Sequence, residues 1–154
     1  MLIKRERSWL GLAASAVIGA GALTLIQYWA RENVRGAPRL DTVGKRALAK
    51  GMKRFGLKPP RRRDLERAAL VGDLISNSLF YGMFVAGKRF GLFRRAIFWG
   101  AAAGLGAIAL APRLGLGRRE VARDLRTKAL TVGMYTAGGL ASASASRVLA
   151  PVPL

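Results

Sequence analysis

Five polar residues interrupt an otherwise apolar stretch in the middle of the chain: Asp73, Ser76, Asn77, Ser78 and Tyr81. Asp73, Asn77 and Tyr81 stand at positions i, i+4 and i+8, so on a helix they share one face, with Ser76 beside them. A carboxylate inside a membrane-buried helix is costly unless it is paired or hydrated, so we expect this face to point into a helix bundle. The stripe predicts either a polar contact between helices or a carboxylate that takes up a proton or cation.

The expected partners of this stripe stand near the start of a later apolar segment: Lys128, Thr131 and Tyr135. We expect this segment and that of Asp73 to enter the membrane from the same side, which would bring the three residues to the depth of Asp73. An Asp73–Lys128 ion pair, or hydrogen bonds from Thr131 and Tyr135 to the Asp73 carboxylate, would then explain the stripe as a structural contact.

Catalysis and metal binding have little support in the composition. The chain has no histidine and no cysteine. That excludes disulfides, thiol catalysis, Ser–His–Asp triads and metal sites built on those two ligands. The polar groups in the apolar segments form no nucleophile–base pair, and no phosphate-binding loop with Lys-Ser/Thr is present. We therefore expect a protein that is not an enzyme and that binds no cofactor and no metal.

The elements that position the stripe are long apolar segments. Of the 154 residues 51% are hydrophobic, yet the net charge is +19, and apolar and charged residues are segregated into blocks. A helix needs roughly 20 apolar residues to cross a bilayer, with about 17 as the lower limit. The blocks predict an all-α integral membrane protein, a single membrane domain over 1–154, with transmembrane helices at about 9–30, 68–87, 96–112 and 129–150.

The connection over 31–67 predicts a further, amphipathic helix at about 42–56. Val43, Ala47, Leu48, Met52 and Phe55 recur at helical spacing, and the basic residues fall mainly on the other faces. This pattern is typical of a helix that lies on the membrane surface. Eight basic residues of the connection are expected to bind anionic lipid or an acidic partner protein: Lys45, Arg46, Lys50, Lys53, Arg54, Arg61, Arg62 and Arg63. We do not expect nucleic acid as a partner, because aromatic residues do not alternate with the basic ones.

The positive charges also predict an orientation. The connections 31–67 and 113–128 together hold 19 of the 27 Lys and Arg residues, and the termini with the middle turn hold 8. Short loops rich in Lys and Arg stay in the cytoplasm. We therefore expect a multi-pass protein of a bacterial cytoplasmic (inner) membrane, with the two longer connections inside and both termini outside.

Small residues recur in the apolar segments and predict close helix packing. The glycines expected at helix contacts are Gly11, Gly19, Gly100, Gly104, Gly133 and Gly138. Such residues let backbones approach closely, within one chain or between chains. Our leading hypothesis is a small non-catalytic accessory or assembly subunit that packs these faces against a larger membrane complex and binds anionic lipid or an acidic partner through its basic loops. The alternative is a small oligomeric channel or proton-linked transporter that uses the intramembrane carboxylate Asp73.

Overall fold

The computed structural model describes residues 8–87 and 90–150. The described residues form six helices and no strand. The helices are α1 (Trp9–Asn33), α2 (Leu40–Arg54), α3 (Arg62–Val85), α4 (Leu92–Arg113), α5 (Arg119–Ala122) and α6 (Leu125–Leu149).

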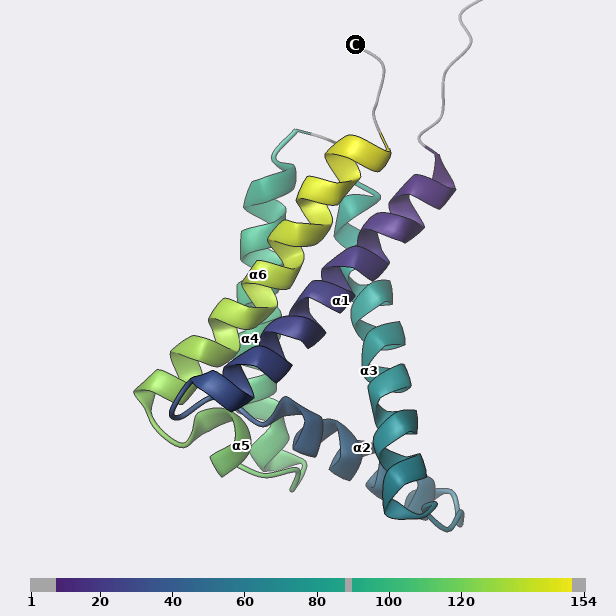
Figure 1. Ribbon diagram of the computed structural model, residues 1–154, viewed down its shortest axis with the longest axis vertical. Helices are drawn as coiled ribbons and strands as arrows, with labels where there is room; N and C mark the ends of the chain where they lie inside the picture. The colour runs from purple at the N-terminus through teal and green to yellow at the C-terminus, as the bar shows by residue number, and fades with distance from the viewer. Residues whose placement is uncertain (1–7, 88–89, 151–154) are drawn as a thin grey trace, which may run out of the picture.

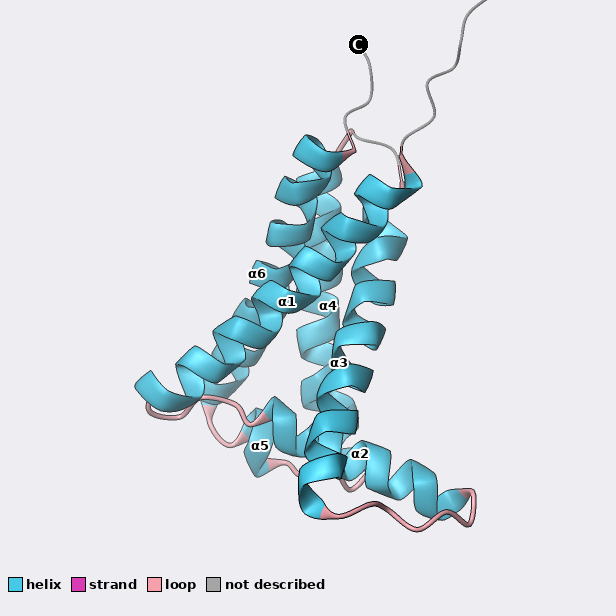
Figure 2. Cartoon of the chain, turned by 45° about the vertical axis from the view of Figure 1, so that its right-hand side comes forward, coloured by secondary structure: helices cyan, strands magenta, loops and turns pink. Residues whose placement is uncertain are grey.

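The four long helices run up and down the length of the molecule (Figure 1). Helices α1 and α6 lie side by side, α4 packs behind α6, and α3 packs on α1. The short helices α2 and α5 lie together at one end, which we call the loop end (Figure 2). The start of α1, the end of α6, the end of α3 and the start of α4 lie at the opposite end, which we call the terminal end. The two long basic connections therefore share one end of the bundle, as the topology prediction requires.

Within residues 8–87 and 90–150, three helices are long and apolar enough to cross a membrane: α1, α3 and α4. They contain 25, 24 and 22 residues, and at about 1.5 Å per residue each exceeds the ~30 Å of a bilayer's hydrocarbon core. The third segment, expected only over 96–112, is extended at its start by four residues from Leu92. The length and composition of these helices identify the chain as an all-helical membrane protein.

Helix α6, which covers most of the fourth predicted span, is long enough but not among these apolar helices. Four spans are therefore not confirmed. The physical reason is where its polar side chains lie: Thr131, Ser142 and Ser146 are 0% exposed, and Thr127 is 1% exposed. A helix enclosed by its neighbours satisfies or hides such groups inside the protein, so its composition can be less apolar than that of a lipid-facing helix.

Glycines bring α6 into close contact with α1 and α4. A Cβ atom on Gly100 would lie 2.6 Å from the Thr136 Cα, and one on Gly104 would lie 2.6 Å from the Val132 Cα. On the other side of α6, a Cβ on Gly19 would lie 2.8 Å from the Gly138 carbonyl oxygen. These backbones approach so closely that no side chain fits between them.

Five of the six glycines expected at helix contacts lie at contacts within the chain. Besides Gly19, Gly100, Gly104 and Gly138, Gly11 faces the carbonyl of Leu149. Gly133 differs, because a Cβ there would meet no atom within 4 Å. The close-packing glycines are therefore used inside the bundle and are not free to receive an external helix.

Helix α2 packs on the protein at the loop end. Leu40 is buried in a small apolar cluster with Ala111, Leu116 and Val121, and Val43 packs against this cluster. Arg46 donates a hydrogen bond to the Leu116 carbonyl over 2.8 Å and Lys50 donates one to the Leu114 carbonyl over 2.6 Å. Basic side chains thus satisfy carbonyls that follow the end of α4. Helix α2 begins at Leu40 instead of at residue 42 because Leu40 packs in this cluster. The sequence pattern predicts that this helix lies on the membrane surface, whereas in the structure its start packs on the protein.

Asp124 caps the start of α6 and provides a pH-dependent test of this element. Its side chain accepts a hydrogen bond from the Thr127 backbone N–H over 2.7 Å. This bond, with the Arg123 guanidinium beside it, lowers the pKa of Asp124 to about 2. A carboxyl with a lowered pKa stabilises the fold above its ordinary pKa, near 4, and this contribution is lost as the pH falls toward 2.

We therefore expect the stability of the chain in mixed micelles to fall between about pH 4 and pH 2, and to fall less in Asp124→Asn. Asparagine keeps the cap but does not titrate. The measurement is the SDS unfolding midpoint at each pH. Asp64→Asn, an exposed carboxyl in the first turn of α3, is the matched control and should keep the wild-type profile. An unchanged profile in Asp124→Asn would contradict the role of the cap.

Candidate functional site

A polar cavity of about 380 Å³ lies between α1, α2 and α3 near the loop end. The three helices contribute its lining as follows: Thr24, Gln27, Tyr28 and Arg31 from α1; Leu40, Asp41, Gly44 and Lys45 from α2; Arg62, Glu66, Ala69, Leu70 and Asp73 from α3. Asp73, the acidic residue of the predicted stripe, thus lines a cavity. Figure 1 shows α1 and α3 diverging toward this end, with α2 between them.

A chain of ion pairs joins the three helices around this cavity. Asp41 pairs with Arg31 over 3.0 Å and with Lys45 over 3.3 Å. Glu66 pairs with Lys45 over 3.3 Å and with Arg62 over 3.5 Å. The side chains are partly or largely solvent-exposed, so each pair contributes little to stability. Two of the three acidic residues of the lining, Asp41 and Glu66, thus have cationic partners, and Asp73 has none among the described residues.

Asp73 is half-buried and forms no ion pair within the described ranges 8–87 and 90–150. The Asn77 side chain, one turn further along α3, lies beside it. Lys128, the expected counter-ion, is exposed. The structure therefore does not bring Asp73 and Lys128 together as an ion pair.

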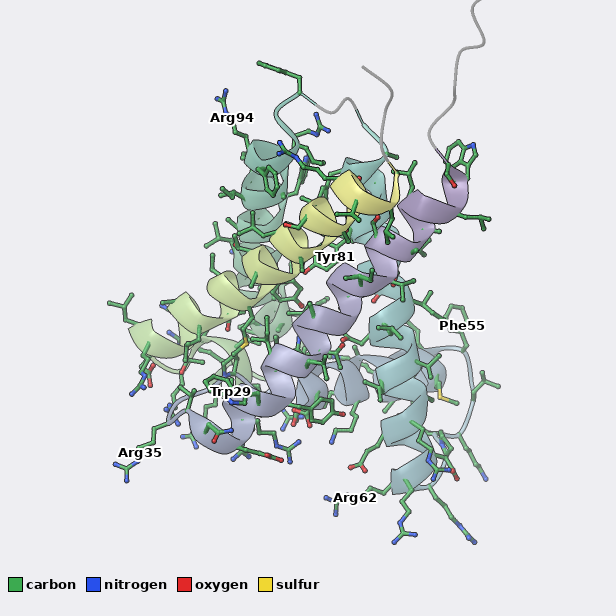
Figure 3. All side chains as sticks on the ribbon, turned by 45° about the horizontal axis from the view of Figure 1, so that its top comes forward. Trp29, Arg35, Phe55, Arg62, Tyr81 and Arg94 are labelled. Carbon is green, nitrogen blue, oxygen red and sulfur yellow. The ribbon has the colours of Figure 1, made fainter. Side chains whose placement is uncertain are left out.

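The remaining stripe residues divide into a buried and an exposed group. Asn77 is 7% exposed and Tyr81 is 0% exposed, and the Tyr81 hydroxyl donates a hydrogen bond to the Tyr135 carbonyl over 2.9 Å. Tyr81 lies inside the bundle, between α3 and the neighbouring helices (Figure 3). Ser76 is exposed and bonds the Asp73 carbonyl of its own helix over 3.1 Å. Only part of the predicted stripe therefore contacts other helices.

Thr131 has a different role from the one expected. Its hydroxyl lies 2.8 Å from the Thr127 carbonyl and 3.1 Å from the Val121 carbonyl, which joins α6 to α5. It makes no hydrogen bond with Asp73 among the described residues. Tyr135 contributes to the stripe through its backbone carbonyl, which receives the Tyr81 hydroxyl.

Sequence reasoning missed the α1 side of the cavity. Thr24, Gln27, Tyr28 and Arg31 stand at i, i+3, i+4 and i+7, so they share one helix face. The signal was present in the sequence, since Gln27 is the only side-chain amide in the first apolar block. What the spacing could not show is that this face meets α3.

The eight basic residues expected to bind lipid or an acidic partner fall into two groups, those with a partner inside the protein and those without an ion pair. Arg46 pairs with Glu120 over 2.7 Å, Lys45 and Arg62 belong to the ion-pair chain, and Lys50 bonds the Leu114 carbonyl. The other four form no ion pair within the part of the chain that the structure describes: Lys53, Arg54, Arg61 and Arg63. Half of the set is therefore used inside the protein.

The cavity offers binding chemistry through its carboxylate, hydroxyl, amide and phenol groups. Among the described residues, no group of three or more His, Cys, Asp or Glu side chains is placed to hold a metal ion. The fold and this site define the class only as a helical membrane protein with a polar cavity at one end. Comparisons with known protein families, with curated proteins and with solved structures give no match.

Proposed function

We propose that the chain is a small non-catalytic accessory subunit that binds a larger membrane complex through α3. The observation that carries this proposal is the incomplete packing of that helix. Helix α3 packs mainly on α1 and touches α4 and α6 little. Its outward side chains are strongly exposed: Val71 and Ile75 at 55%, Leu79 at 68% and Met83 at 79%.

Grooves lie on both sides of α3. The one between α1 and α3, about 460 Å³, is lined by small residues such as Ala13, Ala16 and Gly82, with Leu74 and Leu79 among the larger ones. The one between α3 and α4, about 320 Å³, is bordered by Phe80, Met83 and Trp99. A small-residue groove allows close approach of another backbone, so the proposed occupant is an apolar transmembrane helix of the partner. The proposed docking face therefore lies on α3. The sequence pattern predicts it on the glycines of α1, α4 and α6, most of which pack inside the bundle.

The basic surface at the loop end would support the same role. Phe55 is 83% exposed and Leu57 is 57% exposed, and they lie between Lys53, Arg54 and Lys58 in the chain. Phe55 lies at the periphery, beyond α3 (Figure 3). Exposed apolar groups next to cations suit an anionic leaflet, where each nearby Lys or Arg is worth about 1 kcal/mol. We propose that this end faces the cytoplasm of a bacterial inner membrane.

Four crossings and this orientation can be tested with single cysteines, because the chain has none of its own. Lys58→Cys and Leu125→Cys mark the loop end, and Phe90→Cys and Val148→Cys mark the terminal end; all four positions are exposed. We expect a membrane-impermeant maleimide to label only the terminal-end pair in intact spheroplasts and all four after lysis. Labelling of Lys58→Cys in intact spheroplasts would overturn the orientation. No labelling of Val148→Cys in intact spheroplasts, with Phe90→Cys labelled, would overturn the crossing of α6.

The accessory role is tested by extracting the chain from its native membrane in mild detergent and measuring the mass and composition of the particle. We expect other polypeptides at fixed stoichiometry. Leu79→Trp, in the α1–α3 groove, should release them, whereas Leu105→Trp, at a 58% exposed position on α4, should not. A particle that contains only copies of this chain, or equal retention in the two variants, would contradict the proposal.

Transport through Asp73 is a second candidate, which the polar cavity favours. Beyond Asp73 the stripe continues into Asn77 and Tyr81, which are buried, so a path across the membrane would need a second conformation. On this alternative, vesicles that contain a pH-sensitive dye should show a higher proton permeability with the chain than without it, and Asp73→Asn should abolish the increase. Equal permeability with and without the protein would remove this candidate.

A further inference from the structure

The side chains that line the cavity between α1, α2 and α3 are most exposed at the loop end and less exposed inward. Of those in the chain of ion pairs, Arg62 is 92% and Arg31 is 52% exposed, whereas Asp41 and Lys45 are 27% and 25% exposed. Asp73, the remaining acid of the lining, is half-buried. Solvent therefore reaches the outer groups freely, and the lining continues from them to Asp73.

The chemistry of the lining suits water. Three cationic and three acidic side chains take part in it: Arg31, Lys45, Arg62, Asp41, Glu66 and Asp73. An acyl chain in this space would remove the hydration of these groups, which is costly for partly exposed charges. At roughly 30 Å³ per water molecule, 380 Å³ is room for about ten waters. Water is therefore the occupant that this lining favours.

Asp73 lies within the apolar part of α3, which is long and apolar enough to cross a membrane. The last cation before it on this helix is Arg67, about 9 Å away along the axis at 1.5 Å per residue. A carboxylate at this depth is costly unless it is paired or hydrated. Asp73 forms no ion pair with another described residue, so its hydration has to come through the cavity.

The cavity ends at Asp73. One turn further along α3, Asn77 is buried, and one turn beyond that Tyr81 is fully buried and donates its hydroxyl to the Tyr135 carbonyl on α6 over 2.9 Å. Leu23 on α1 is fully buried as well, and both Leu23 and Tyr81 lie against Gly138. None of Asn77, Tyr81 and Leu23 lines the cavity. Water that enters from the loop end therefore meets packed protein beyond Asp73.

We propose that this cavity is a water-filled vestibule that connects Asp73 to the aqueous solution on the loop side of the membrane, and on that side only. The vestibule admits water and small hydrated cations to the Asp73 carboxylate, and the packed side chains beyond Asp73 stop them there. The proposal depends on the crossing of α3 and not on the accessory role. For transport through Asp73, it assigns one of the two aqueous accesses that a path across the membrane needs.

The experiment measures how fast single cysteines react with a methanethiosulfonate reagent that carries a sulfonate group and does not cross membranes. The reacting species is the thiolate, which forms in water and not in lipid. Spheroplasts and inverted vesicles present opposite faces of the membrane, and Lys58→Cys and Phe90→Cys mark the loop side and the terminal side. Val71→Cys is the matched control: Val71 is 55% exposed, stands two residues nearer the loop end and does not line the cavity. From the loop side, we expect Asp73→Cys to react at least about tenfold faster than Val71→Cys.

Two further positions define the extent of the vestibule. Asn77→Cys, one turn beyond Asp73, should react slowly from both sides. Ala69→Cys, at a lining position one turn nearer the loop end, keeps Asp73 and should react as fast as Asp73→Cys, so it provides the result if Asp73→Cys does not fold. Rates at 69 and 73 no higher than that of Val71→Cys, fast reaction of Asn77→Cys, or reaction of Asp73→Cys from the terminal side would overturn the proposal. Reaction of Lys58→Cys and Phe90→Cys from one and the same side would also overturn it, because α3 would then not cross the membrane.

Discussion

Tyr81→Ala is expected to lower the free energy of unfolding by about 2–4 kcal/mol. Tyr81 is 0% exposed, packs its ring against Phe80 and Phe84, and donates a hydrogen bond to the Tyr135 carbonyl on α6. Alanine would leave a cavity and remove this link between α3 and α6. The loss arises from contacts and the hydrogen bond, because lipid already solvates apolar groups in the unfolded state.

The measurement is SDS-induced unfolding of the purified chain, followed by circular dichroism. Tyr81→Phe separates the two contributions, since it keeps the ring and loses only the hydroxyl; we expect a loss of about 0.5–1.5 kcal/mol. Leu79→Ala, at a 68% exposed position on the same helix, should change stability by less than about 0.5 kcal/mol. If Tyr81→Ala were no worse than Leu79→Ala, α3 would not be anchored through Tyr81.

Gly100→Ala is expected to destabilise the chain by about 1–3 kcal/mol through overpacking. A single added Cβ would lie 2.6 Å from the Thr136 Cα and 3.0 Å from the Tyr135 carbonyl oxygen. Both neighbours are backbone atoms of α6, so the clash cannot be relieved by rotating a side chain. Helices α4 and α6 would have to move apart along their contact.

Gly106→Ala is the control on the same helix, because a Cβ at Gly106 meets no atom within 4 Å. We expect it to keep or slightly raise stability, since alanine has the higher helix propensity. Gly138→Ala and Gly133→Ala repeat the comparison on α6, where only the first faces Tyr81 and Gly19. The same unfolding titration is used. Equal stability of Gly100→Ala and Gly106→Ala would show that α4 and α6 are not in close contact.

The local properties of the chain could be predicted from its residues. Runs of apolar residues long enough for a bilayer predicted α1, α3 and α4, because the hydropathy and the length of a segment depend only on that segment's own residues. The 3.6-residue period predicted that Asp73, Asn77 and Tyr81 share a face. The same period predicted a helix near 42–56, found at Leu40–Arg54. These predictions depend on residues that are close in the chain.

Which faces meet depends on contacts between distant residues, and there the predictions diverge from the structure. Asp73 faces α1 and α2 instead of Lys128, and Arg46 bonds Leu116, a residue 70 positions away. Five of the six glycines expected at helix contacts pack inside the bundle, whereas the pattern left open whether their partners belong to this chain. A helical period defines a face but not its neighbour, since that is chosen by the packing of all the helices together. The residues therefore specified the helices and their polar faces, and the packing of the bundle placed Thr24, Gln27 and Asp73 around one cavity.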